Sequence, residues 1–198
     1  MAYIEQCQAE SCQILGFFFR SWRANPVKVG AILPSGPALS AAITREIGPA
    51  HAPILELGCG TGVFTQKIVE CGIPATELLL VEDDPFFAGH LQAKFPQAQI
   101  LCIDACSIYL MPIHLDKAIG AVICGLPLRN MSMKQQFRIL QGAFDSLREN
   151  GALYLFSYGW RCPLSSPLLA RLDLRADLLD TVLLNLPPAK VWKIIRRR

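Results

Sequence analysis

Apolar and polar positions along the chain follow two different periods, and these predict two kinds of element. Short runs rich in β-branched residues and leucine predict buried strands at 53–58, 77–82, 98–104, 118–124 and 152–158. Between them, apolar residues recur at helical spacing and predict helices at 65–72, 86–95 and 132–150, the last ended by Gly151. Strands that alternate with helices indicate an α/β fold with a mostly parallel sheet.

The last part of the chain carries a different pattern. Two apolar runs, 177–186 and 189–198, flank Pro187 and Pro188. This arrangement predicts an antiparallel hairpin at one side of the otherwise parallel sheet. The chain shows no internal repeat and no low-complexity linker, so we expect one domain over residues 1–198, with its core at 50–198.

The first 25 residues form a third pattern. At helical spacing, Phe18 and Trp22 share an apolar face with four residues nearer the start, whereas Arg20 and Arg23 lie off that face. An apolar face with aromatic residues beside basic ones is typical of a helix that lies in a membrane interface. We therefore predict a membrane-interface helix at 1–25, with contacts from Phe18, Phe19, Arg20, Trp22 and Arg23; a helix that only covers the sheet is the alternative.

Composition narrows the class of protein. Hydrophobic residues make up 52% of the chain, charged residues 18%, and the mean hydropathy is +0.34. No apolar run reaches the roughly 18 residues that span a bilayer, and no signal peptide is evident, so we expect a cytoplasmic protein held at the inner face of the membrane. The net charge is +3, with basic residues clustered at both ends, which suits anionic lipid.

Metal and disulfide chemistry are not indicated. The eight cysteines lie mostly inside apolar segments and form no CxxC pair. The three histidines lie in unrelated segments without metal-ligand spacing. We expect free thiols and no metal site.

A glycine loop follows the first predicted strand. The sequence ILELGCGTG at 54–62 places Glu56 and three glycines where an open α/β sheet binds its ligand. A dinucleotide fingerprint would need glycine at position 63, where the chain has Val63, which weighs against NAD. The pattern E-x-G-x-G-x-G resembles the S-adenosylmethionine (SAM) loop of class I methyltransferases, a resemblance that implies a Rossmann-like fold, SAM as cofactor and S-adenosylhomocysteine as product.

Two further strand ends fit that resemblance. Glu82 ends the second strand, and a carboxylate there accepts hydrogen bonds from both ribose hydroxyls. By resemblance, Asp104 and Ala105 would contact the adenine. The predicted cofactor residues are Glu56, Gly58, Cys59, Gly60, Gly62, Glu82, Asp83, Asp104 and Ala105.

The segment after the fourth strand bears on the acceptor. Adenine methyltransferases carry Asn/Asp-Pro-Pro-Tyr or Asn-Leu-Pro-Tyr there, whereas this chain reads CGLPLRN, with Gly125 and Leu128 in place of the base-reading groups. Together with NPVKVGAILPSG at 25–36 and NLPPAKVW at 185–192, Gly-Leu-Pro is similar to bacterial phospholipid N-methyltransferases of the soluble class I type. The resemblance covers roughly residues 17–195 and implies SAM-dependent methylation of phosphatidylethanolamine, through its mono- and dimethyl derivatives, to phosphatidylcholine, without nucleic acid as a partner.

Methyl transfer needs mainly alignment in a dry site. We assign that alignment to Gly125, Leu126 and Pro127. A cationic product suits aromatic faces and a lipid phosphate suits basic groups, which gives the predicted substrate residues Lys28, Ser35, Arg129, Tyr154 and Tyr158. Three alternatives stay open: an RNA adenine methyltransferase, a peripheral membrane protein that binds SAM or lipid without turnover, and a methyltransferase of a soluble small molecule.

Overall fold

The computed structural model describes residues 36–110, 118–185 and 187–197. The strands in this part of the chain are β1 (Ile54–Leu57), β2 (Leu78–Val81), β3 (Gln99–Leu101), β4 (Ile119–Cys124), β5 (Leu147–Tyr158), β6 (Leu174–Val182) and β7 (Ala189–Arg196). The α-helices are α3 (Pro37–Ile43), α4 (Val63–Glu70), α5 (Pro85–Lys94), α6 (Met133–Ser146) and α7 (Ser166–Arg171). Short 3-10 helices are η1 (Pro49–His51), η2 (Ala75–Glu77), η3 (Ala105–Leu110) and η4 (Leu128–Asn130).

All seven strands belong to one sheet, in the order β3-β2-β1-β4-β5-β7-β6. The first five run parallel, and β7 enters antiparallel between β5 and β6. The predicted α/β fold with a terminal antiparallel hairpin is confirmed. The strand order turns back between β1 and β4, which is where open sheets of this kind bind their ligands.

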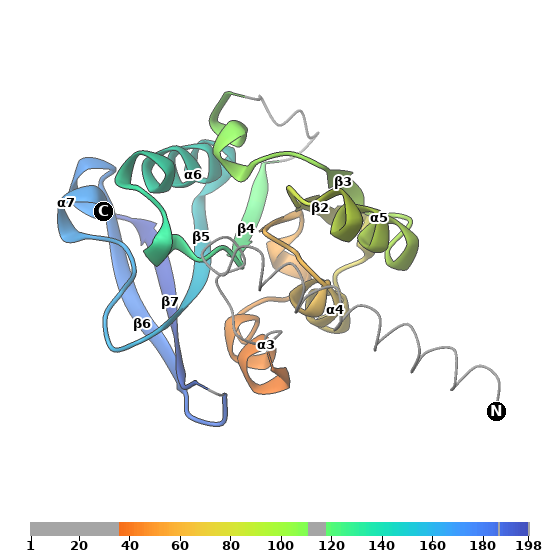
Figure 1. Ribbon diagram of the computed structural model, residues 1–198, viewed down its shortest axis with the longest axis horizontal. Helices are drawn as coiled ribbons and strands as arrows, with labels where there is room; N and C mark the ends of the chain where they lie inside the picture. The colour runs from red at the N-terminus through yellow and green to blue at the C-terminus, as the bar shows by residue number, and fades with distance from the viewer. Residues whose placement is uncertain (1–35, 111–117, 186, 198) are drawn as a thin grey trace.

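Helices cover both faces of the sheet (Figure 1). Side chains of alternate strand residues point to opposite faces, so Leu55 and Leu57 of β1 pack with α6 and α7, whereas Ile54 packs with α3, α4 and α5. Because both faces are covered, β1, β2 and β4 are buried at every position. Glu56 lies on the same face as Ile54 and therefore points toward α4.

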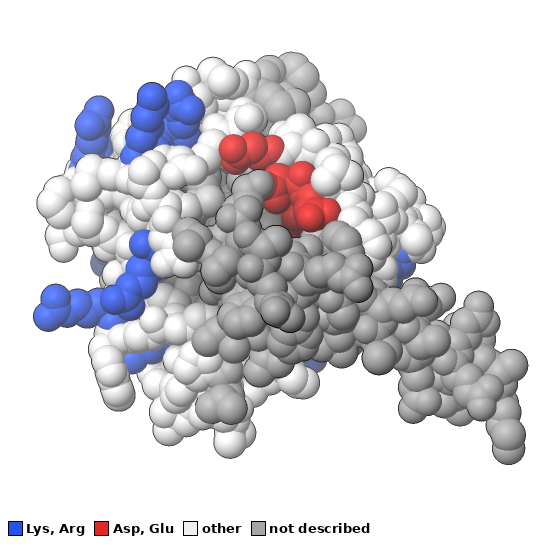
Figure 2. Space-filling model, viewed as in Figure 1, with Lys and Arg blue, Asp and Glu red and all other residues white. Residues whose placement is uncertain are grey.

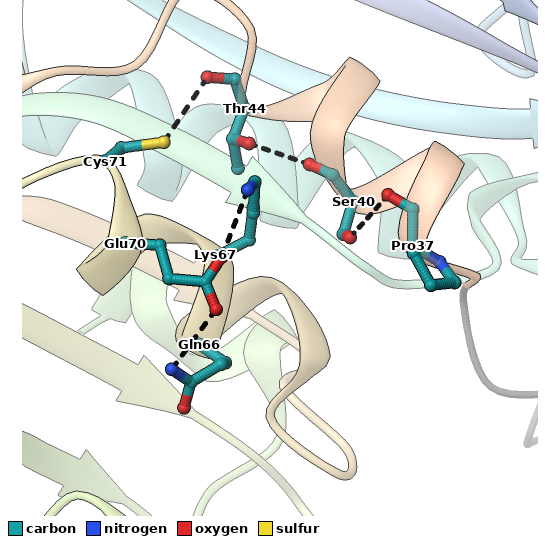
Figure 3. A network of polar contacts seen from close by, with 7 residues as sticks. All are labelled: Pro37, Ser40, Thr44, Gln66, Lys67, Glu70 and Cys71. Carbon is teal, nitrogen blue, oxygen red and sulfur yellow. Dashed lines mark hydrogen bonds and ion pairs between the residues drawn. The ribbon is translucent and has the colours of Figure 1, made fainter.

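The C-cap residues of α3 and α4, Thr44 and Cys71, are in contact with each other (Figure 3). The Thr44 hydroxyl donates to the Ser40 carbonyl at 2.7 Å, and the Cys71 thiol donates to the Thr44 carbonyl at 3.9 Å. Beyond α3, the Lys193 ammonium lies 2.7 Å from the Glu46 carboxylate. These contacts fix the segment that enters the described structure at Gly36 against the sheet.

The helix predicted at 132–150 ends four residues early, at Ser146, and β5 begins directly at Leu147. The reason is tertiary, because the guanidinium of Arg196 on β7 donates to carbonyls where the helix ends. The carbonyls belong to Phe144, Leu147, Arg148 and Glu149. A planar guanidinium can satisfy several carbonyls at once, so these groups have partners although the helix does not continue.

One helix was missed by the sequence prediction. Its first residues, Ser166 and Pro167, follow Ser165, whose hydroxyl accepts from the Leu168 amide at 3.4 Å. The helix α7 is only six residues long, too short for a helical period to stand out. The predicted helix at 1–25 lies outside the described residues. Among the described residues, no helix is long and apolar enough to cross a membrane.

Candidate cofactor and acceptor site

The loops after β1, β2 and β4 meet at the carboxyl edge of the sheet. The Gly125 amide donates to the Leu57 carbonyl at 2.8 Å, and the Gly58 amide donates to the Val81 carbonyl at 2.8 Å. These bonds continue the sheet by one residue on each side of β1. The glycine loop and the loop that begins at Gly125 are thereby brought together at the place where the strand order turns back.

The glycine loop requires glycine for two separate reasons. Gly58, Gly60 and Gly62 have φ of 73°, 52° and 75°, a conformation that other residues adopt at a cost. At Gly58 a Cβ atom would lie 2.5 Å from the Leu126 side chain, whereas at Gly60 it would meet no atom of the described residues within 4 Å. The described residues therefore leave space beside the Gly60 backbone, where a ligand could approach it closely.

Glu82 holds this loop in place. Its carboxylate accepts from the Gly60 amide at 2.7 Å and from the Asp84 amide at 3.1 Å. The side chain is nearly buried, and burial raises its pKa while the two amide bonds lower it. The two bonds use one acceptor position on each oxygen, and a carboxylate oxygen accepts about two hydrogen bonds. Glu82 therefore keeps acceptor positions that fit ribose hydroxyls beside the open backbone of Gly60.

Glu56 is buried with one oxygen satisfied and one not. Its Oε2 accepts from the Thr65 hydroxyl at 2.7 Å, and its Oε1 has no partner among the described residues. Burial raises the pKa of Glu56 to about 8. A buried polar atom without a partner is uncommon in folded proteins and calls for a ligand or an ordered water. A cofactor with positive charge fits it, because such a charge would stabilise the ionised carboxylate.

The other cofactor predictions fall into two groups. Asp83 and Asp104 are exposed, and the Asp104 carboxylate accepts from the Cys106 amide at 2.8 Å. Figure 2 shows acidic side chains gathered over the ends of β2 and β3, whereas Lys and Arg lie mainly over α6, α7 and β6. Cys59 and Ala105 are buried, and the Cys59 thiol points to the carbonyls of Glu56 and Val81. Cys59 can therefore offer a ligand only its backbone.

Taken together, these residues fit SAM. Glu82 keeps acceptor positions that would suit ribose hydroxyls, the described residues leave space beside the Gly60 backbone, and a positively charged ligand would stabilise the ionised Glu56 carboxylate. In residues 36–110, 118–185 and 187–197, no three side chains of His, Cys, Asp or Glu lie close enough together to hold a metal ion.

A cavity of about 150 Å³ opens beside the glycine loop. It is lined by residues 125–130 and 156–158 together with Pro163. The predicted residues Gly125, Leu126, Pro127, Arg129 and Tyr158 thus share one cavity. The Arg129 guanidinium donates to the Tyr158 carbonyl at 3.3 Å, which joins the two loops at the rim.

Gly125 has a packing reason to be glycine. A Cβ atom there would lie 2.6 Å from the Gly58 carbonyl oxygen, so a side chain at 125 would push the glycine loop away. Leu128 is 2% exposed and belongs to the core beneath the cavity. Gly125 has no side chain and Leu128 is apolar, so neither residue presents a group that could hydrogen-bond to a base.

Tyr154 is a correction to the predicted substrate set. It lies four residues before Tyr158 on β5, about 13 Å from the end of the strand. Its side chain is buried, and its hydroxyl donates to the Glu46 carboxylate at 2.9 Å. Tyr154 therefore anchors the segment after α3 and does not reach the cavity. The predicted residues Lys28, Ser35, Phe18, Phe19, Arg20, Trp22 and Arg23 lie outside the described residues.

Gln136 is a positioning residue that the sequence analysis missed. Its amide nitrogen donates to the Leu128 carbonyl at 2.7 Å and to the Met131 carbonyl at 3.2 Å. These bonds fix the end of the loop that lines the cavity. The available signal was a polar residue on the apolar stripe of α6, at helical spacing from Ile139 and Leu140.

We expect Glu82→Gln to raise the dissociation constant for SAM by about tenfold, because the amide removes the charge that strengthens hydrogen bonds to the ribose. Isothermal titration calorimetry measures this directly. Glu70→Gln, which changes an exposed carboxylate at the end of α4, is the matched control. Equal affinity in wild type and Glu82→Gln would remove the ribose assignment.

The raised pKa of Glu56 makes stability depend on pH. The folded protein binds this proton more tightly than the unfolded chain, whose carboxyl keeps its ordinary pKa of 4.5. The contribution is present below pH 4.5 and is lost as the pH rises through about 8. In urea titrations of the protein without cofactor, the free energy of unfolding should therefore fall over this range by up to about 1.4 kcal/mol per pH unit. Glu56→Gln should show a smaller fall, and identical slopes would contradict the assignment.

No protein-family model matches the chain. The chain is 29% identical over 154 residues to an ornithine lipid N-methyltransferase of Singulisphaera acidiphila, an alignment that covers 71% of this chain and 78% of that protein.

Solved structures with this fold are numerous and distant in sequence. The 1,6-didemethyltoxoflavin-N1-methyltransferase of Burkholderia thailandensis, solved with S-adenosylhomocysteine, gives a TM-score of 0.61 at 15% identity and covers 96% of this chain and 90% of its own. The glycopeptide N-methyltransferase MtfA, solved with SAM, gives 0.61 at 12% identity and covers 83% and 96%. Sheet order, glycine loop and structural likeness agree that the chain has the fold of the class I SAM-dependent methyltransferases.

Proposed function

We propose that the chain is a SAM-dependent N-methyltransferase that acts on the headgroup amine of a membrane lipid, with phosphatidylethanolamine and its mono- and dimethyl derivatives as acceptors on the way to phosphatidylcholine. The observation that carries the proposal is the close packing of the Gly125 backbone against the Gly58 carbonyl oxygen. It leaves no room for the polar side chain with which adenine methyltransferases hold a base.

The distant likeness to an ornithine lipid N-methyltransferase supports a lipid acceptor. Phosphatidylethanolamine and ornithine both offer a primary amine near an anionic group, a phosphate in one and a carboxylate in the other. Arg129 at the rim of the cavity suits either anion, since a guanidinium pairs with both.

When bound, SAM supplies an electrophilic methyl group on a sulfonium. The chain's own task is to align the acceptor and exclude water. The Gly125–Pro127 segment sets the wall of the cavity next to the glycine loop, and Gln136 prevents this wall from shifting.

Tyr158 serves the acceptor without taking its proton. Burial raises the pKa of Tyr158, so its phenol stays neutral near pH 7. A neutral ring beside the cavity stabilises the methylated ammonium through its face. Before each methyl transfer, the acceptor ammonium must lose one proton, which it gives to water.

The first test offers several acceptors to the full chain with labelled SAM. We expect label in phosphatidylethanolamine vesicles, resolved as mono-, di- and trimethylated headgroups. Parallel tubes contain ornithine lipid vesicles, unmodified ribosomal RNA and ethanolamine in solution. Label confined to ornithine lipid would keep the lipid class and overturn the headgroup, and label mainly in RNA or free ethanolamine would overturn the proposal.

Variants at Tyr158 test the role of its ring. Tyr158→Ala should lower formation of the trimethylated product about tenfold, because cation–π attraction grows as the acceptor becomes a permanent cation. Tyr158→Phe keeps the ring and should stay within about twofold of wild type. The measurement is the ratio of tri- to monomethylated lipid, and equal ratios in both variants would show that the ring has no such role.

A further inference from the structure

The turn between β6 and β7 exposes two leucines. Leu183 is 72% exposed and Leu184 is 93% exposed. The last paired residues of the hairpin are Val182 and Ala189, so both leucines lie beyond the sheet. Figure 1 shows the turn at the lower end of β6 and β7, beside α3. Burial of a leucine side chain lowers the free energy of the folded protein, so two adjacent leucines with such exposure are uncommon unless the surface has a partner.

A tryptophan is exposed at the same edge of the sheet. Trp160 is 83% exposed, and the Lys190 ammonium lies 5.2 Å from the centre of its ring. Strand register sets this arrangement, because Lys190 of β7 pairs with residue 157 of β5 on one side and with residue 181 of β6 on the other. Trp160 follows the end of β5 by two residues, so it and the turn leave the sheet at the same level.

Charge distinguishes the possible partners. The segments 156–165 and 181–190 contain Arg161 and Lys190 and no Asp or Glu. Both basic residues flank Trp160, one in sequence and one in space. Exposed leucine, tryptophan and basic groups in one small area match a lipid interface, where apolar tips enter the acyl region and cations meet anionic headgroups.

The same residues adjoin the acceptor cavity. Ser157 and Tyr158 line the cavity, and they are the strand partners of Lys190 and Ala189. A bilayer that contacts the turn would therefore lie at the side of the cavity, from which a headgroup must enter.

We propose that Trp160, Arg161, Leu183, Leu184 and Lys190 form a hairpin-tip surface that docks on an anionic phospholipid bilayer. This inference extends the proposed function, since lipid methylation supplies the reason to dock. The hairpin-tip surface is separate from the helix predicted at 1–25, because its five residues lie between 160 and 190.

The test uses the full chain and the double variant Leu183→Ser/Leu184→Ser. The control is Leu178→Ser on β6, because Leu178 is also exposed, at 49%, yet lies roughly 16 Å along the strand from the turn. Cosedimentation is measured with phosphatidylethanolamine vesicles with and without phosphatidylglycerol. We expect the double variant to bind vesicles about tenfold more weakly and the control to stay within about twofold. Affinity for SAM should be the same in all three proteins.

Three results would overturn the inference. These are unchanged vesicle binding by the double variant, an equal loss in Leu178→Ser, or a loss of self-association in sedimentation velocity without any loss of vesicle binding. The last result would assign the surface to a second copy of the chain.

Methyl transfer to a short-chain phosphatidylethanolamine, dissolved as monomers, separates this inference from the proposed function. We expect wild type and double variant to methylate the monomeric lipid equally, and only the double variant to lose activity on vesicles. If wild type methylates neither form yet binds vesicles through the turn, the proposed function fails and the surface stands. If the double variant binds and methylates vesicles like wild type, the surface fails and the function stands.

Discussion

The close approach of Gly58 to Gly125 is the contact on which the site depends. A Cβ atom at Gly125 would lie 2.6 Å from the Gly58 carbonyl oxygen, and one at Gly58 would lie 2.5 Å from Leu126. The loop that would hold the cofactor and the loop that would hold the acceptor are thus packed directly on each other. Methyl transfer would need the cofactor and the acceptor in line, and this contact fixes the spacing of the two loops that would hold them.

Electrostatics divide the carboxyl edge of the sheet into two regions. Glu56 and Glu82 lie buried beneath the glycine loop, and burial raises the pKa of both. A positively charged ligand nearby would lower the pKa of both carboxyl groups. Binding of such a ligand and ionisation of Glu56 would therefore favour each other. Arg129 brings positive charge to the lining of the cavity, and Lys190 lies on the strand next to Ser157, which also lines it. A cationic cofactor would therefore meet the acidic region, and the phosphate of a lipid headgroup would meet Arg129.

The terminal hairpin links the fold to the acceptor side. Because Ala189 of β7 pairs with Tyr158 of β5 on one side and with Val182 of β6 on the other, the turn that begins at Leu183 lies level with the end of β5, where Tyr158 lines the cavity. The same strand carries Arg196, which ends α6, and Lys193, which pairs with Glu46. One strand thus stabilises both helical layers and sets the height of the hairpin-tip surface.

Local sequence determined the strands, the glycine loop and the carboxylate at Glu82, because these depend on short-range periodicity and on the backbone needs of a tight turn. It also brought Gly125, Arg129 and Tyr158 into the candidate set, through the resemblance of Gly-Leu-Pro and through the chemistry that a lipid phosphate and a cationic product need.

Only the tertiary structure showed that Tyr154 is not a substrate residue, that α6 ends at Ser146 and that Gln136 positions the loop before α6. In each case the deciding partner is more than four residues away: Glu46 for Tyr154, Arg196 for α6, and the Leu128 carbonyl for Gln136. The contacts of Tyr154 and of Arg196 join segments far apart in the chain, so they leave no periodic trace in the sequence and depend on how the fold brings these segments together. The bonds of Gln136 are closer in sequence, but they depend on the path of the loop before α6.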